Sequence, residues 1–202
     1  MIKPFLQKVE DYVRSILETK TPPQNIYHDF THTKDVAESS IEIGIGEKLT
    51  EEDLEIVQIS AWFHDIGYIQ KTKGHEKISI MYARDFLRDN HYPLEKTKKI
   101  IGCILATKVP QNPKNKLEKI VCDSDLNHIG RETFFERNDK YRVEYENYLG
   151  RKLTDYEWIT KTIDFVSNHI FFTDYTQKKF SKQKEKNLRI LRSQLQAVTQ
   201  PK

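Results

Sequence analysis

The chain has 202 residues and a formal net charge of +3, with 31% charged and 37% hydrophobic residues. This length allows one sizeable domain and is marginal for two. No window approaches 18 consecutive apolar residues, and the N-terminal residues lack the apolar core of a signal peptide, so we expect neither a membrane span nor a secretion signal.

Helical periodicity dominates the chain, and the alternation typical of strands is nearly absent. The pattern predicts helices over residues 3–19, 32–44, 50–65, 75–90, 94–107, 115–127, 131–149, 154–170 and 175–196. Thr50 and Asp53 resemble a capping box at the start of the third helix, and Pro93 fits the first turn of the fifth. No repeat or shift in composition marks a boundary. We therefore predict one all-α domain over residues 1–202.

The two cysteines, Cys103 and Cys122, each lie in an apolar run and lack the spacing of a zinc site. Buried free thiols in a reducing compartment are the simplest interpretation, and they favour a cytoplasmic protein.

Basic residues gather near the C-terminus. Between Lys178 and Arg192 there are seven basic residues and one acidic residue, a local charge of +6. Because the whole chain carries +3 and Lys202 adds one charge, residues 1–177 sum to −4. The basic tail, residues 178–192, could contact nucleic acid or an anionic membrane, but a solvated helix face explains it more simply.

The dipeptide His64-Asp65 ends one of the most apolar segments of this polar chain, residues 56–67. Burying a charge is costly unless it is paired or bound to a metal. A neighbouring imidazole and carboxylate can supply one nitrogen and one oxygen ligand to a single divalent cation. His32 precedes the pair by 32 residues, and Asp123 and Asp125 follow it by about 60. This distributed set is typical of a hydrolytic metal centre.

Four segments occur in a recognisable order: Tyr27-His28-Asp29-Phe30-Thr31-His32, Ala61-Trp62-Phe63-His64-Asp65-Ile66-Gly67-Tyr68, Gly74-His75-Glu76-Lys77-Ile78-Ser79 and Cys122-Asp123-Ser124-Asp125-Leu126-Asn127-His128-Ile129-Gly130. Together they resemble the HD-domain superfamily of metal-dependent phosphohydrolases. The resemblance is close over residues 25–130 and extends through the helical layout to residues 131–202. It implies a helical bundle with a metal site in a central cleft.

The resemblance implies metal ligation by His32, His64, Asp65 and Asp125. Asp125 is preferred to Asp123 because the family's last ligand usually precedes a leucine-like residue, here Leu126.

The segment His28-Asp29-Phe30-Thr31-His32 also resembles the His-Asn-x-x-His segment of cyclic-nucleotide phosphodiesterases. The resemblance makes His28 a candidate acid that protonates the leaving oxygen. Asp29 replaces the asparagine, and a structural role for His28 is an equal alternative.

His75 matches the first of the additional histidines that hold a second metal in some HD proteins, but Thr107 stands where the later one is expected. We therefore favour one tightly held metal, with His75 contacting the substrate or a weaker second ion. Two imidazoles and two carboxylates suit Mn²⁺, our first choice, or Fe²⁺, Co²⁺, Ni²⁺ or Zn²⁺, and Mg²⁺ could still support turnover.

The expected function is hydrolysis of a nucleotide or other small phosphoester, by attack of a metal-bound hydroxide on phosphorus. Asp65 or Asp125 would orient the nucleophile, and Lys108 and Arg131 are candidate phosphate contacts. One alternative is a nucleotide-sensing module without turnover, and another is a nucleic-acid-binding protein or nuclease that uses the basic tail. We expect a small phosphorylated substrate, no membrane partner and no nucleic acid, and a homodimer is as compatible with the resemblance as a monomer.

Overall fold

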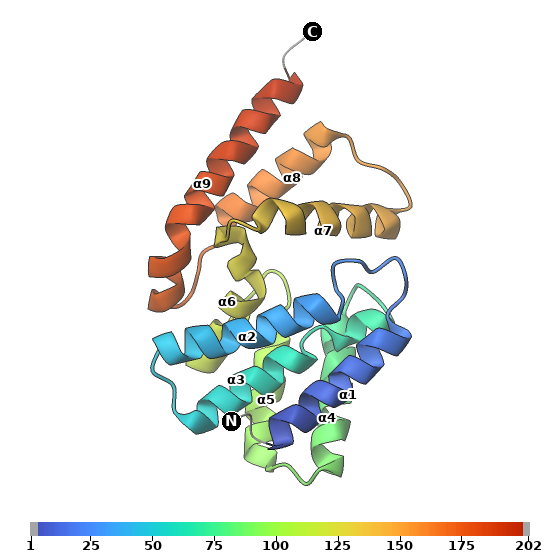
Figure 1. The fold of residues 1–202 in the computed structure, drawn as a ribbon, viewed down its shortest axis with the longest axis vertical. Coiled ribbons are helices and arrows are strands. Elements are labelled where there is room, and N and C mark those ends of the chain that lie inside the picture. Colours follow the sequence, from blue (N-terminus) through green and yellow to red (C-terminus); the bar gives the residue numbers. More distant parts are fainter. Residues whose placement is uncertain (1–3, 200–202) are drawn as a thin grey trace. The chain divides into compact units, whose positions relative to one another are not determined.

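The structure, a computed structural model, describes residues 4–199, so Lys3 and Lys202, which entered the predictions, lie outside the described residues. Within residues 4–199 the chain forms nine α-helices and two short 3-10 helices and no strand, which confirms the all-α prediction (Figure 1). The elements are α1 (Pro4–Lys20), α2 (Phe30–Gly46), α3 (Glu51–Phe63), η1 (Ile66–Ile69), α4 (His75–Asp89), α5 (Leu94–Ala106), α6 (Lys116–Leu126), η2 (Asn127–Gly130), α7 (Phe134–Leu149), α8 (Asp155–Asn168) and α9 (Asp174–Thr199).

The start of α7 and the position of Pro93 differ from the prediction for local reasons. α7 begins at Phe134 instead of residue 131, because η2 ends in extended backbone at Arg131 (φ −111°, ψ 162°). Pro93 was predicted in the first turn of α5, and in the structure it is the N-cap residue, just before the first turn. At that place the missing N–H of proline costs no helical hydrogen bond.

The described residues form two compact units, one ending at Asp125 and the other beginning at Leu126. The prediction of one domain over residues 1–202 spans both units and stays a prediction.

The first unit is built around α3, which contacts α1, α2, α4 and α5; Figure 1 shows α1, α2 and α3 side by side. α3 is buried on most of its surface because nearly every residue from Ile56 to Phe63 is small or apolar. Its N-terminus is capped by Thr50, whose Oγ1 accepts a hydrogen bond from the Asp53 backbone at 3.2 Å. This buried helix carries His64 and Asp65 into the interior of the unit.

The second unit contains η2, α7, α8 and α9, with α8 packed along α9. Its core is aromatic and aliphatic, and Phe134, Val166, Phe171 and Leu191 are almost completely buried in it. Asn187 in α9 donates from Nδ2 to the backbone oxygens of Ile129 (3.0 Å) and Arg131 (2.9 Å), which fixes η2 against the helix.

Both cysteines are buried and carry free thiols, as predicted. The Cys122 Sγ lies 3.2 Å from the backbone oxygen of Ala106, to which it donates. Burial raises the pKa of the Cys103 thiol to about 12, so it stays protonated at neutral pH.

Candidate metal centre

The end of α3 places the His-Asp pair. His64 is the C-cap of α3, and Asp65 follows with φ −112° before the chain enters η1. The next turn requires glycine, because a Cβ on Gly67 would lie 2.1 Å from the backbone oxygen of His75. The Gly67 N–H donates to Ser79 Oγ at 3.0 Å. This close approach brings the start of α4, and with it His75, next to the His-Asp pair.

The start of α2 places His28 and His32. Asp29 is the N-cap of α2, and its Oδ1 accepts a hydrogen bond from the His32 backbone at 2.8 Å. Aspartate and asparagine cap helices about equally well, because each offers a side-chain oxygen. The aspartate that replaces the asparagine of the phosphodiesterase segment therefore performs a capping role that either residue could fill.

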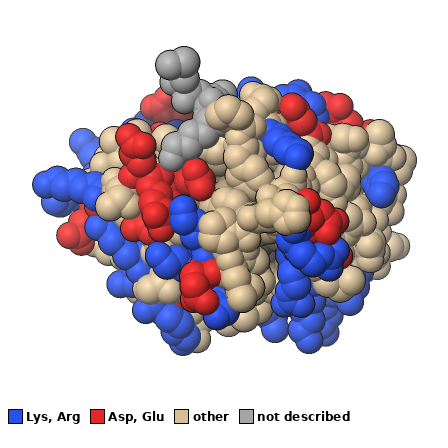
Figure 2. All heavy atoms as spheres, turned by 90° about the horizontal axis from the view of Figure 1, so that it is seen from below, with Lys and Arg blue, Asp and Glu red and all other residues tan. Residues whose placement is uncertain are grey.

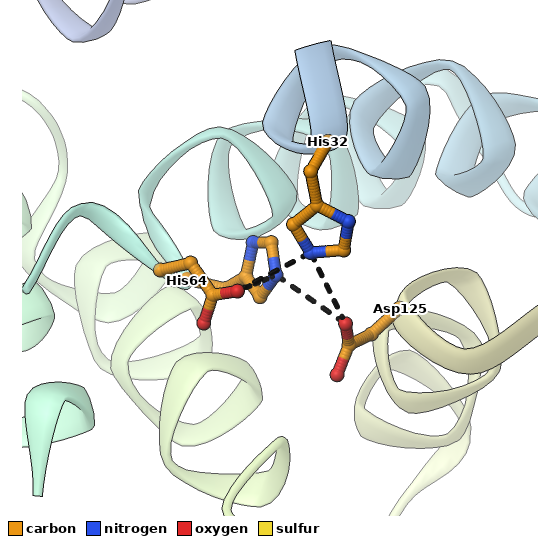
Figure 3. Close-up of side chains that lie close together, drawn as sticks. His32, His64 and Asp125 are labelled. Carbon is orange, nitrogen blue, oxygen red and sulfur yellow. Dashed lines mark ion pairs between the residues drawn. The ribbon is translucent and has the colours of Figure 1, made fainter. Parts of the chain in front are cut away.

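Four predicted ligands converge in the first unit. The Asp65 Oδ2 lies 3.2 Å from His32 Nε2 and 3.1 Å from His64 Nε2. The Asp125 Oδ1 lies 3.6 Å and 3.5 Å from the same two nitrogens. One ligand atom from each residue falls within 4.8 Å of all the others. Figure 3 shows His32, His64 and Asp125 pointing toward one another from three helical segments.

The donor set fits a divalent cation. His64 is fully buried and its Nδ1 donates to the Ala61 oxygen at 2.8 Å, so Nε2 is the nitrogen that faces the carboxylates and is available to a cation. The Nε2 atoms of His32 and His64 are buried and make no contact with hydrogen-bond geometry. Two imidazole nitrogens and two carboxylate oxygens aimed at one point suit a transition metal.

The same groups perturb one another's proton affinities. Burial disfavours the charged form of His64, but Asp65 and Asp125 outweigh it and hold the pKa of His64 well above its usual range. Burial likewise opposes the charged form of Asp65, yet His64 and His32 hold the pKa of Asp65 well below its usual range. The cluster therefore favours a positive charge between its carboxylates.

His28 and His75 lie on either side of Asp65. His75 Nε2 is 3.2 Å from Asp65 Oδ1, and His28 Nε2 is 3.8 Å from Asp65 Oδ2. The Nδ1 of His75 lies 2.8 Å from the Thr72 oxygen, so the ring is oriented in the same manner as that of His64. The catalytic role of His28 and the substrate role of His75 stay predictions.

Tyr68 is a residue of this site that the sequence reasoning missed. Its ring lies between the two imidazoles, with centroid distances of 3.7 Å to His28 and 4.0 Å to His75. Asn25 Nδ2 donates to the Tyr68 backbone oxygen at 3.0 Å, which ties the loop before α2 to η1. The signal was its position three residues after Asp65, on a turn that must fold back beside the ligands.

Of the other predicted contacts, Lys108 belongs to the first unit and Arg131 to the second. Lys108 is exposed just beyond α5. In the second unit, Arg131 Nε donates to Asn127 Oδ1 at 2.5 Å and its guanidinium lies 4.7 Å from the Phe180 ring centre. Their roles as phosphate contacts stay predictions. Thr107 is buried, and its Oγ1 donates to the Ile104 oxygen at 2.9 Å, so the place expected for a second-metal histidine holds a helix-terminating threonine.

The basic tail forms part of α9. Lys178, Lys182, Lys186, Arg189 and Arg192 are all exposed, and they repeat at three- and four-residue intervals along one face of the helix. Figure 2 shows one face of the molecule, on which basic and acidic side chains both occur with an uncharged region between them.

The fold and the ligand cluster define a helical protein with a buried His/Asp centre suited to a divalent cation. The HD domain family matches residues 29–168, more than half of the chain, and the chain belongs to this family. This membership supports a metal-dependent phosphohydrolase in general.

Solved structures share the fold. An HD superfamily hydrolase from an uncultured Thermotogales bacterium is similar at 19% identity and a TM-score of 0.66, covering 96% of this chain and 94% of the other. Bacillus subtilis YpgQ in complex with ADP has 17% identity and a TM-score of 0.67, with 96% and 98% covered. A Lactobacillus plantarum protein has 14% identity and a TM-score of 0.71, with 98% of both chains covered. The comparison with curated proteins found no match. Among the described residues, none of the helices has the length and apolar character needed to cross a bilayer.

Proposed function

We propose that this protein is a metal-dependent phosphohydrolase that acts on a nucleotide or another small phosphoester. The observation that carries the proposal is the buried convergence of His32, His64, Asp65 and Asp125. These residues would hold the cation, with Mn²⁺ as the first choice from their two nitrogen and two oxygen donors. When bound, such a cation lowers the pKa of a coordinated water and withdraws charge from a phosphoryl oxygen.

The chain's own residues supply the remaining steps of the proposal. Asp65 faces both the ligand histidines and His75, so its carboxylate can orient the attacking water. His28, whose Nε2 lies 3.8 Å from Asp65 Oδ2, would give a proton to the departing oxygen in this proposal. An imidazole suits this task because its unperturbed pKa is about 6.5.

The proposal that the substrate is a nucleotide is supported by a protein of similar fold. The Bacillus subtilis neighbour of similar fold was solved with ADP, which supports testing adenine nucleotides first. Lys108 and Arg131 remain candidate phosphate contacts within this proposal.

The test compares the metal content of wild-type protein with that of the His64→Ala/Asp65→Ala variant, followed by a phosphate-release screen over nucleotides. His91→Asn is the matched control, since His91 is exposed and has a φ of 53° that asparagine tolerates. We expect about one transition metal per chain in wild type and control, none in the double variant, and metal-dependent release only where metal is present. Saturable nucleotide binding without product under any metal would instead favour a sensing module, and no metal in the wild type would overturn the proposal.

A further inference from the structure

Gln111 contacts a predicted metal ligand from the loop between α5 and α6. Its Nε2 lies 3.4 Å from Asp125 Oδ2 and 3.3 Å from the backbone oxygen of Cys122. Both partners belong to α6, where Asp125 lies in the last turn. The loop residue therefore reaches the same carboxylate that faces the two ligand histidines.

The orientation of the Gln111 amide follows from its partners. A carboxylate oxygen and a backbone carbonyl only accept hydrogen bonds, so the amide nitrogen, and not the amide oxygen, faces them. Because Oδ2 of Asp125 accepts from Gln111, Oδ1 is the oxygen directed at His32 Nε2 and His64 Nε2, at 3.6 Å and 3.5 Å. Gln111 thus distinguishes the two oxygens of the carboxylate.

The other end of the amide argues against a purely structural role. The Gln111 Oε1 is buried and makes no hydrogen bond. A buried acceptor without a partner opposes folding, so it offsets what the two hydrogen bonds of Nε2 contribute. Its amide nitrogen is directed at Asp125, a side chain of the metal cluster.

We propose that Gln111 is a positioning residue that holds the Asp125 carboxylate with Oδ1 toward the histidines, and so sets the affinity and geometry of the metal site. This inference rests on the proposed function only in taking Asp125 as a metal ligand. Partners that orient ligands in this manner typically change metal affinity about 10- to 100-fold when they are replaced.

The experiment titrates Co²⁺, followed by its visible absorption, and Mn²⁺, followed by calorimetry, into metal-free wild type, Gln111→Ala and Gln111→Glu. The control is Asn112→Ala, because Asn112 is exposed in the same loop. We expect the alanine variant to bind about 10- to 100-fold more weakly with an altered Co²⁺ spectrum. The glutamate variant should bind more weakly still, since its carboxylate faces Asp125 and a carbonyl oxygen, and the control should match wild type.

Thermal melting of the metal-free proteins separates positioning from structural damage. Because Gln111→Ala removes the unsatisfied Oε1 together with the two hydrogen bonds of Nε2, its melting temperature should stay close to that of wild type. A wild-type metal affinity and Co²⁺ spectrum in both Gln111 variants, or an equal loss in Asn112→Ala, would overturn the inference. Wild-type protein that binds metal but releases no phosphate would defeat the proposed function and leave this inference standing.

Discussion

Asp65 is the residue on which the candidate centre depends most, because its two oxygens serve different partners. Oδ2 faces His32 and His64, and Oδ1 faces His75. Each of His64 and His75 turns its Nδ1 to a backbone oxygen, so backbone geometry alone aims both Nε2 atoms at this carboxylate. The dipeptide predicted from the sequence thus forms the middle of the cluster.

The two aspartates of α6 should differ in their effect on metal binding. Only Asp125 joins the group of four ligand atoms, while Asp123 is fully buried and has other interactions. We expect Asp125→Asn to lose most bound metal and Asp123→Asn to retain it, with any loss in the latter appearing as reduced stability. Elemental analysis together with thermal melting of both variants checks this, and equal metal loss would contradict the assignment of Asp125.

Gly67 is a second residue on which the site depends, because the position has no room for a side chain. In Gly67→Ala the new Cβ would meet the His75 carbonyl, which is backbone and cannot rotate away. We expect a loss of about 1–3 kcal/mol in the free energy of unfolding, measured by urea denaturation, together with weakened activity as His75 shifts. The matched control is Gly102→Ala within α5, where the Cβ meets only the flexible end of Glu118 at 3.2 Å. A control as unstable as the test variant would contradict the explanation.

Among the elements, the junction of α7 and α8 contains a carboxylate, Glu146, that contacts several of its residues. Glu146 is 6% exposed, and it pairs with Lys152 at 2.8 Å, accepts from the Leu153 backbone at 3.1 Å and pairs with Arg142 at 3.1 Å. Lys152, the Leu153 N–H and Arg142 together lower the pKa of Glu146 from 4.5 to about 2. The helix that follows starts with a capping box formed by Thr154 and Glu157.

This lowered pKa predicts a pH dependence of stability. A carboxyl whose pKa is lower in the folded state stabilises the fold above its unfolded value of 4.5 and loses that contribution as the pH falls toward 2. We therefore expect Glu146→Gln to melt at a lower temperature than wild type at neutral pH, and the difference to shrink as the pH falls through this window. Glu136→Gln is the control, since Glu136 is 68% exposed. A difference that stays constant with pH would contradict the prediction.

At the scale of the whole molecule, the helical class and the approximate helix bounds could be predicted from the sequence. The α4 helix, predicted over 75–90, ends at Asp89, and α9, predicted over 175–196, extends from Asp174 to Thr199. Apolar spacing and caps are local signals, and they act over the same few residues that form a helix. The residue types of His32, His64 and Asp65 already indicated a metal centre, and the family resemblance selected Asp125 in place of Asp123 as the fourth ligand.

The remaining features depend on contacts between distant residues. Gln111 reaches Asp125 across 14 positions, and Tyr68 lies between two histidines from different segments. Gln111 has no local pattern that distinguishes it from other loop glutamines, and the place of Tyr68 just after Asp65 does not by itself predict its contacts with both histidines. The boundary between the two units at Asp125 and Leu126 falls within the last turn of α6, where no proline, glycine or change of composition marks it.

The basic face of α9 provides a test that separates small substrates from polyanions. If the substrate is a small phosphoester, Lys178→Gln/Lys182→Gln/Arg189→Gln should keep kcat/KM within about twofold of wild type at low and high salt. Steady-state kinetics over a salt series checks this expectation. A large loss of activity in the triple variant, with steeply salt-dependent nucleic-acid binding by wild type, would favour the nuclease alternative.

The stack of His28, Tyr68 and His75 has a consequence for selectivity among substrates. A tyrosine can bind a nucleobase through its ring face, an interaction worth about 1–3 kcal/mol per base, but both faces of Tyr68 are covered by imidazoles. The ring of Tyr68 is therefore closed to bases. If nucleotides are hydrolysed here, we expect this ring to contribute nothing to discrimination between purines and pyrimidines, so preference for one base must arise from other contacts.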